Sequence, residues 1–205
     1  MNPYRPVYMT SETTRQRAVI FHGYGATPDD HWFGWLADRL REDGITTTIP
    51  ALPDPLDPDP HRWGRTIGET LGVPDKQTTV VAHSLGCLAT LRYLHSLSAA
   101  WHLNTLVLVA GFVDRLPALP ELDEFIGDRL NLTDLDDHID RLVVIRSDDD
   151  PLVPPALTDR LAGLLGVPAQ IVPGAGHFLA TDGISALPSA YDAATSSRCP
   201  PGSPG

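Results

Sequence analysis

A serine at a sharp corner of the chain is the first candidate for chemistry. Ser84 lies in the stretch AHSLG (82–86), which ends an apolar β-branched run and leads at once into an apolar segment with helical spacing. Small residues at both ends of such a pentapeptide are typical of a nucleophile elbow, a tight strand-to-helix turn that exposes a hydroxyl above a sheet. Ala82 and Gly86 hold these positions. The alternative is a serine that only caps the helix.

A serine hydroxyl is a weak nucleophile until a base takes its proton and a third group orients that base. Two later segments supply an acid and then a histidine, in the order that an elbow requires. Asp150 is the preferred acid because it directly precedes PLVP, where the chain leaves a strand and a carboxylate can face inward. Its neighbours Asp148 and Asp149 are expected to be solvated. His177, beside glycines in GAGHF, is the expected base.

Attack on a carbonyl also needs donors for the oxyanion that forms. The backbone amide of Leu85 is one candidate, because it lies at a helix N-terminus where the dipole favours negative charge. The segment IFHGYGATPDDHW (20–32) supplies the second, for which the amide of Tyr24 is the best candidate. His22, in the same segment, is expected to brace the loop by hydrogen bonding rather than to act as a base.

The remaining aromatic and metal-binding residue types have simpler roles. Trp32 is expected to pack in the core, the alternative being that Trp32 or Phe33 lines a substrate pocket beside the oxyanion loop. His83 is expected to pack beneath the elbow. The other histidines have no partner suggested by spacing, and the two cysteines form no metal-binding pattern. No metal or other cofactor is therefore expected.

The elements that must position these residues alternate along the chain. Short apolar runs are separated by segments with apolar residues near every third or fourth position, a pattern that predicts a parallel sheet with helices on both faces. Both the acid and the histidine then follow strands at the carboxyl edge, where open α/β sheets assemble their sites. The six predicted strands are 17–22, 45–50, 78–83, 105–110, 142–147 and 169–173.

Three segments between these elements carry further predictions. TPDD (27–30) predicts a helix start, with Thr27 as the cap and Pro28 in the first helical position. The proline-rich segment 51–60 is predicted to be a stiff exposed crossing. The segment 112–138, between the fourth and fifth strands, allows only a small lid. Its apolar residues are expected to pack as a helix over the sheet, the alternative being a cover for a modest acyl pocket: Leu116, Leu119, Leu122 and Phe125.

Composition limits the class of protein. The chain has 205 residues, of which 42% are hydrophobic and 20% charged, and this fits one globular domain, expected at 1–195, with a disordered tail at 196–205. A formal net charge of -11 makes nucleic acid and anionic membranes poor partners. The first residues lack the apolar region of a secretory signal, so a cytoplasmic protein is the default expectation. The sequence gives no indication of an oligomeric state.

Four motifs in order resemble the α/β-hydrolase superfamily, and within it the small cap-less serine hydrolases of the family that includes retinoblastoma-binding protein 9. The motifs lie between Arg17 and Leu179. The resemblance implies a triad of Ser84, Asp150 and His177 and a single domain with minimal or no cap. The family usually closes with a longer C-terminal helix than this chain offers, because Pro188 interrupts it. The motifs are IFHGYGATPDDHWFGWL, VAHSLG, SDDDPLVP and GAGHF.

The resemblance implies a serine hydrolase that cleaves carboxylic esters, or small amides or thioesters, as small-molecule substrates. Two other classes stay open. The fold also hosts enzymes that use a His-Asp base for elimination or cyclisation, because such a pair can abstract a carbon-bound proton. The third class is a binding module with an unused triad, which would not react with a fluorophosphonate.

Overall fold

The computed structural model describes residues 16–128 and 130–196. The tail expected at 196–205 therefore lies outside the described residues except for Ser196. The domain expected at 1–195 is described from residue 16 onward, with residue 129 omitted.

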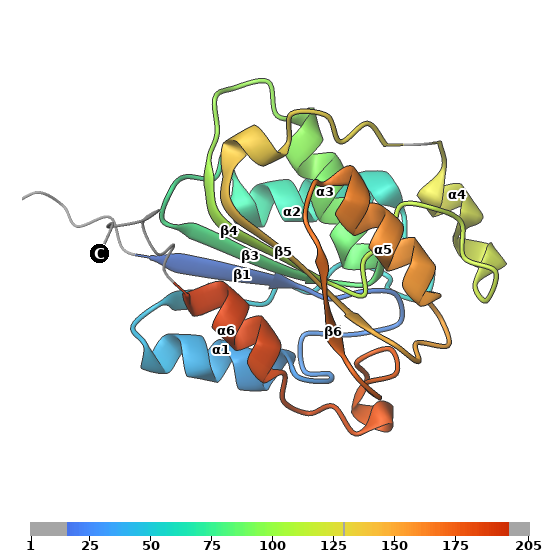
Figure 1. Cartoon of the computed structure of the whole chain (residues 1–205). Helices are drawn as coiled ribbons and strands as arrows, with labels where there is room; N and C mark the ends of the chain where they lie inside the picture. The colour runs from blue at the N-terminus through green and yellow to red at the C-terminus, as the bar shows by residue number, and fades with distance from the viewer. Residues whose placement is uncertain (1–15, 129, 197–205) are drawn as a thin grey trace, which may run out of the picture.

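Six strands form one sheet in the order β2-β1-β3-β4-β5-β6, and every neighbouring pair is parallel (Figure 1). The predicted α/β fold is thus confirmed, with a strand at each of the six predicted places. Because β1 and β3 are neighbours and β4 to β6 continue on the far side of β3, Ser84 follows a central strand. The strands are β1 (Arg17–Phe21), β2 (Thr46–Thr48), β3 (Thr78–His83), β4 (Leu103–Val109), β5 (Ile139–Ser147) and β6 (Ala169–Val172).

Helices cover both faces of the sheet, and each face has its own core (Figure 1). Successive side chains of a strand point to opposite faces. In β1, Val19 and Phe21 accordingly pack in one core, while Ala18 and Ile20 pack in the other. The first core is covered by α2 (Pro60–Leu71), α3 (Leu85–Ser96) and α5 (Pro155–Leu164), and the second by α1 (Phe33–Glu42) and α6 (Pro188–Thr195).

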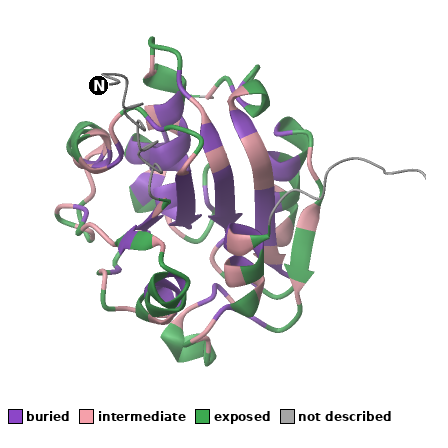
Figure 2. Ribbon diagram, turned by 90° about the vertical axis from the view of Figure 1, so that its left-hand side faces the viewer, coloured by how far each residue is buried: buried purple, intermediate pink, exposed green. Residues whose placement is uncertain are grey.

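Burial follows from this layering. Figure 2 shows the central strands buried and the edge strand β6 largely exposed. Every residue of β3 is buried, which explains why its sequence is a continuous apolar and threonine run rather than an alternating one. None of the helices in the described part of the chain combines the length and the hydropathy of a membrane span.

One prediction about a helix end was wrong. The helix expected to start at Thr27 begins only at Phe33, because Asp30 accepts hydrogen bonds from the amide and hydroxyl of Thr27 and closes a turn, and His31 then adopts a positive φ of 57°. The last helix is short, as expected, and Pro188 limits it by starting it, at the position where a missing N–H costs nothing.

The segment 112–138 packs against the α2–α3 side of the domain. Its side chains Leu116, Leu122 and Phe125 are buried in the first core, and Leu119 is half-buried against it. They pack as expected, but from turns and one short helix rather than from the helix that was predicted. Arg92 of α3 donates hydrogen bonds to the carbonyl groups at the end of α4. The described residues form no separate cap domain. The segment contains the 3₁₀ turns η1 (Pro120–Leu122) and η2 (Asp136–His138) and the short helix α4 (Asp123–Ile126).

Candidate active site

Ser84 lies on the turn between β3 and α3 with a strained backbone. Its φ of 52° and ψ of -124° lie in a region that residues other than glycine rarely adopt, a strain that persists only where the surroundings enforce it. The surroundings here are a hydrogen bond from the Ser84 amide to the carbonyl oxygen of Val109 on β4, at 2.9 Å, and one from the amide of Cys87 to the Ser84 carbonyl oxygen, also at 2.9 Å. The side chain is therefore lifted above the carboxyl edge of the sheet.

Two glycines allow the elbow to approach the end of β1. A Cβ atom on Gly86 would lie 2.3 Å from the carbonyl oxygen of His22, and one on Gly23 would lie 2.8 Å from the Cβ of Ser84. Neither position can accept a side chain without backbone movement. This contact brings the loop after β1 against the serine.

Ser84, His177 and Asp150 form one chain of hydrogen bonds. His177 Nε2 lies 2.9 Å from Ser84 Oγ, and His177 Nδ1 lies 2.7 Å from Asp150 Oδ2. All three residues are buried, with exposed fractions of 5%, 4% and 8% respectively. The structure thus brings together three side chains that are far apart in sequence, in the order that a nucleophile, a base and an orienting acid would require.

The loop after β5 orients Asp150. Its Oδ1 atom accepts hydrogen bonds from the amides of Leu152 and Val153, both at 2.9 Å, which leaves Oδ2 for His177. The prolines that flank these two residues, in PLVP, stiffen the turn. Asp150 is therefore the carboxylate that faces inward, as its position before this turn predicted.

The two preceding aspartates are exposed, as expected, but they also hold the histidine loop. Asp148 Oδ1 accepts a hydrogen bond from the amide of Gly174 at 2.8 Å, and Asp149 Oδ1 accepts one from the amide of Gly176 at 2.9 Å. The hydroxyl of Ser147 donates to Asp149, and together with the Gly176 amide it lowers the pKa of this carboxyl. Sequence reasoning missed this link between the acid loop and the histidine loop.

Asp182 is a second residue that sequence reasoning missed. Its Oδ2 atom accepts hydrogen bonds from the amides of His177 at 2.9 Å and Leu179 at 3.0 Å. Gly176 and Phe178, on either side of the histidine, both have positive φ angles, so the loop is tightly coiled around this carboxylate. Only an acid five residues after the histidine in the sequence hinted at the contact.

His83 packs beneath the elbow, as expected, and supports the histidine loop. Its Nε2–H donates to the carbonyl oxygen of His177 at 2.9 Å, and the two ring centroids are 4.9 Å apart. Burial, with a smaller effect of the neighbouring His177, holds the pKa of His83 well below its ordinary value. A neutral ring therefore lies under the base.

His22 braces the loop after β1 by hydrogen bonding, as expected. Its Nε2 accepts a hydrogen bond from the amide of Leu52 at 2.9 Å, so Nδ1 carries the hydrogen and donates to the carbonyl oxygen of Gly23 at 3.0 Å. Burial lowers the pKa of His22, which keeps this tautomer neutral. The side chain thus joins the loop after β1 to the proline-rich segment.

The backbone amides of Tyr24 and Leu85 are available to a ligand. Leu85 is the first residue of α3, and Tyr24 follows the glycine that touches Ser84. Among the hydrogen bonds of the described residues, neither amide donates to a protein acceptor. Both therefore have an unused donor beside the serine.

Trp32 and Phe33 do not face a pocket. Both side chains have no exposed surface and belong to the core between the sheet and α1, where their rings pack edge to face at 4.8 Å. The core role expected for Trp32 is thus confirmed, and the alternative pocket role of Trp32 and Phe33 has no support. No three His, Cys, Asp or Glu side chains of the described residues gather as a metal site.

Comparisons with known proteins give the same assignment of fold and class. The family model described as "Serine hydrolase" matches residues 18–196. A protein of Bacillus subtilis strain 168, YdeN, which is named as a hydrolase, is 37% identical over 181 residues, or 88% of this chain and 95% of the relative. The crystal structure of the ydeN gene product superimposes with a TM-score of 0.83 over 86% of this chain and 95% of that one.

A more distant structure shares the fold alone. A hydrolase of the alpha/beta superfamily from Xanthomonas campestris has a TM-score of 0.58 at 19% identity, over 80% of this chain and 88% of that one. These likenesses support the α/β-hydrolase superfamily. The narrower resemblance to the retinoblastoma-binding protein 9 family stays a prediction.

Proposed function

The chain belongs to the serine hydrolase family, and on this premise we propose that it hydrolyses carboxylic esters through an acyl-enzyme on Ser84. The observation that supports the proposal best is the hydrogen-bonded chain from Ser84 through His177 to Asp150. Small amides and thioesters present the same carbonyl chemistry and are the alternative substrates.

In the first half of the reaction, Ser84 Oγ attacks the ester carbonyl while its proton passes to His177 Nε2. Asp150 holds the imidazole with Nε2 toward the serine and stabilises the imidazolium that forms. The amides of Tyr24 and Leu85 bind the oxyanion. When the tetrahedral intermediate collapses, the bond to the alcohol breaks, and the alcohol oxygen takes the proton from His177.

In the second half, water replaces the alcohol. His177 accepts a proton from the water, the hydroxide equivalent adds to the acyl carbon, and the carboxylic acid leaves as Ser84 regains its proton. The same groups therefore serve both steps. The low exposure of Ser84 and His177 limits competition from bulk water for their hydrogen bonds.

The strained elbow supports hydrolysis over two alternatives. An elimination can proceed with the base alone, and a binding module needs neither a nucleophile nor an aligned base. A serine held at positive φ, 2.9 Å from a histidine, costs conformational energy that is most simply explained by a use of the hydroxyl.

Replacement of the hydroxyl tests the proposal. Ser84→Ala should lower kcat/KM for p-nitrophenyl acetate by at least about a thousandfold, because only the oxyanion donors and binding would be left. Ser98→Ala, an exposed serine after α3, is the matched control and should keep full activity. Near-native turnover in Ser84→Ala, with circular dichroism unchanged, would remove the proposed function.

A further inference from the structure

A groove opens beside the loop that carries the Tyr24 amide. It has a volume of about 570 Å³, and it lies between the proline-rich segment that precedes α2 and the η1–α4 segment. Volumes of this size are typical of small-molecule sites. Leu122 and Phe125, both almost fully buried, form its floor, and Leu56 forms a wall. The proposed mechanism uses none of these three side chains.

Leu56 is an exposed apolar side chain on a rigid support. Its exposed fraction is 74%, yet the segment around it is tied to the oxyanion loop by a hydrogen bond from the amide of Gly25 to the carbonyl oxygen of Pro55 at 2.8 Å. The indole N–H of Trp63 donates to the carbonyl oxygen of Pro53 at 2.8 Å. An apolar side chain held in place against the loop that carries the Tyr24 amide is suited to contact with substrate rather than with solvent.

The sheet order indicates which part of an ester reaches this groove. β1, which precedes Tyr24, lies on one side of β3, whereas β6, which precedes His177, lies on the other. The alcohol oxygen must take its proton from His177, so the alcohol group lies on the β6 side. The acyl group is then left with the β1 side, where the groove begins.

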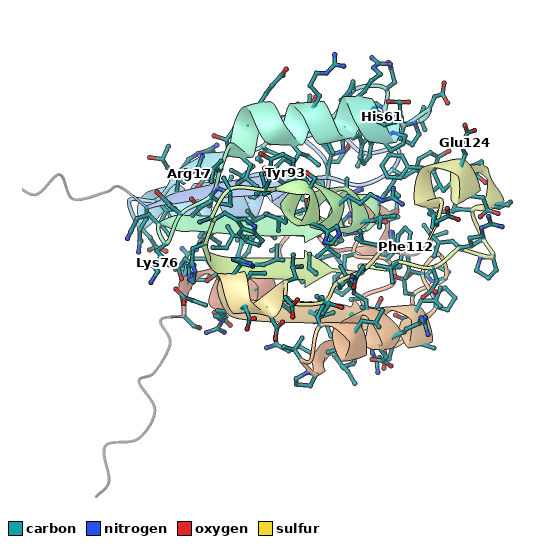
Figure 3. The ribbon with its side chains drawn as sticks, turned by 90° about the horizontal axis from the view of Figure 1, so that it is seen from above. Arg17, His61, Lys76, Tyr93, Phe112 and Glu124 are labelled. Atoms are coloured by element: carbon teal, nitrogen blue, oxygen red, sulfur yellow. The ribbon has the colours of Figure 1, made fainter. Side chains whose placement is uncertain are left out.

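The groove continues away from the serine. A second hollow of about 590 Å³, between α2, α3 and α4, shares four lining residues with the first, among them His61 and Glu124. Figure 3 shows His61 at the end of α2 that lies toward α4, where Glu124 is found. The second hollow adds Gly64, Ala89, Tyr93 and Arg92 to its lining, and the Arg92 guanidinium donates to the carbonyl oxygens of Phe125 and Ile126. The two together can hold an extended chain.

The charges that line the first hollow indicate whether the bound acyl chain is charged or neutral. Four carboxylates line the first hollow, at Asp57, Asp59, Glu121 and Glu124, while the one arginine among its lining residues, Arg62, pairs with Asp54. An anionic group would be repelled there, most strongly at low ionic strength.

We propose that this groove binds the acyl chain of the substrate, and that it selects uncharged, extended acyl groups through Leu56, Leu122 and Phe125. This inference rests on the proposed function, because the groove is assigned by its position beside the oxyanion donors. It adds a substrate class to that function, esters of medium-length unsubstituted carboxylic acids in preference to acetates and to half-esters of dicarboxylic acids.

Chain length tests the apolar wall. Leu56→Ala should lower kcat/KM for p-nitrophenyl octanoate by about five- to tenfold, the effect of a lost apolar contact in a binding pocket, and lower kcat/KM for p-nitrophenyl acetate much less. Leu164→Ala, a half-exposed leucine at the end of α5, is the matched control and should change neither. If Leu56→Ala lowered kcat/KM equally for both esters, or acted no differently from Leu164→Ala, the groove assignment would be wrong.

Charge is tested with the mono-p-nitrophenyl ester of suberic acid, which adds a terminal carboxylate to the octanoate chain. Wild type should prefer octanoate, and Glu124→Gln should raise the relative kcat/KM of the anionic ester about two- to fivefold at low salt. Glu69→Gln, farther along α2, should not. Equal effects of the two glutamine variants would overturn the selection against anions. Failure of the proposed function is a separate result, because it would show as acetate turnover that survives in Ser84→Ala.

Discussion

At the scale of single residues, the proposed base is held by groups on every side. His177 bonds Asp150 and Ser84 through its ring, Asp182 through its amide and His83 through its carbonyl oxygen. Such support fixes the ring with little freedom to lose when substrate binds, which is what a proposed base requires.

The acid gives a graded prediction. Asp150→Asn should lower kcat/KM by about three to four orders of magnitude, because an amide favours the wrong imidazole tautomer and cannot stabilise the imidazolium. Asp148→Asn should stay within about tenfold of wild type, because it only accepts one amide hydrogen bond in an exposed loop. Steady-state kinetics on p-nitrophenyl acetate measures both. A larger loss at Asp148 than at Asp150 would contradict the assignment of the acid.

The sequence predicted the site residues that have a distinctive local sequence pattern. It did not predict the residues whose role depends only on tertiary contacts. Asp150 was identifiable because a stiff turn follows it, and His177 because glycines surround it. Ser147 has no such local mark, because its hydroxyl accepts from the Ala175 amide only when the loops after β5 and β6 meet. Asp182 accepts from the His177 amide only when its own loop folds back on the histidine. The pocket alternative for Trp32 and Phe33 failed because both rings point into the α1 core.

At the scale of elements, the elbow depends on the close approach of β1 and α3. Alternation of apolar runs was enough to predict six strands and a parallel sheet. The start of helix α1 was predicted too early. The sequence from Thr27 to Asp30 resembles a helix cap, but the hydrogen bonds from Thr27 to the Asp30 carboxylate stabilise a turn instead.

Two glycine variants test the close contact between β1 and α3. Gly86→Ala should lower the free energy of unfolding by about 2–4 kcal/mol, because its Cβ would lie 2.3 Å from the carbonyl oxygen of His22. Gly163→Ala in α5, whose Cβ would meet nothing within 4 Å, should raise it by about 0.5–1 kcal/mol. Urea denaturation compares the two variants, and equal stability would show that the elbow has room to relax.

At the scale of the whole molecule, the fold places several histidines where burial favours the neutral imidazole. Burial is the largest cause of a lowered pKa for His22, His31 and His83. In the unfolded chain these rings bind protons at about pH 6.5. The unfolded state therefore binds more protons below that pH, and the stability from the neutral rings, fully present above it, is lost as the pH falls.

The loss of stability at low pH can be measured. Between about pH 6.5 and pH 5 the free energy of unfolding should fall with decreasing pH, by up to about 1.4 kcal/mol per pH unit for each histidine that stays neutral in the folded state. His83→Gln should reduce this slope, whereas His95→Gln, on the exposed end of α3, should leave it unchanged. Urea titrations across the range measure the slope. A slope in His83→Gln equal to that of wild type would show that His83 takes up a proton without unfolding.

The central claim is that Ser84 is the nucleophile, and its most direct test is labelling with a fluorophosphonate followed by peptide mass spectrometry. The serine oxygen would form a bond to phosphorus, fluoride would leave, and His177 would take the proton, so that the adduct is stable. We expect one adduct per chain, on the peptide that contains Ser84, and none in Ser84→Ala. A folded wild type that hydrolyses esters but carries no adduct, or carries it on another residue, would contradict the account.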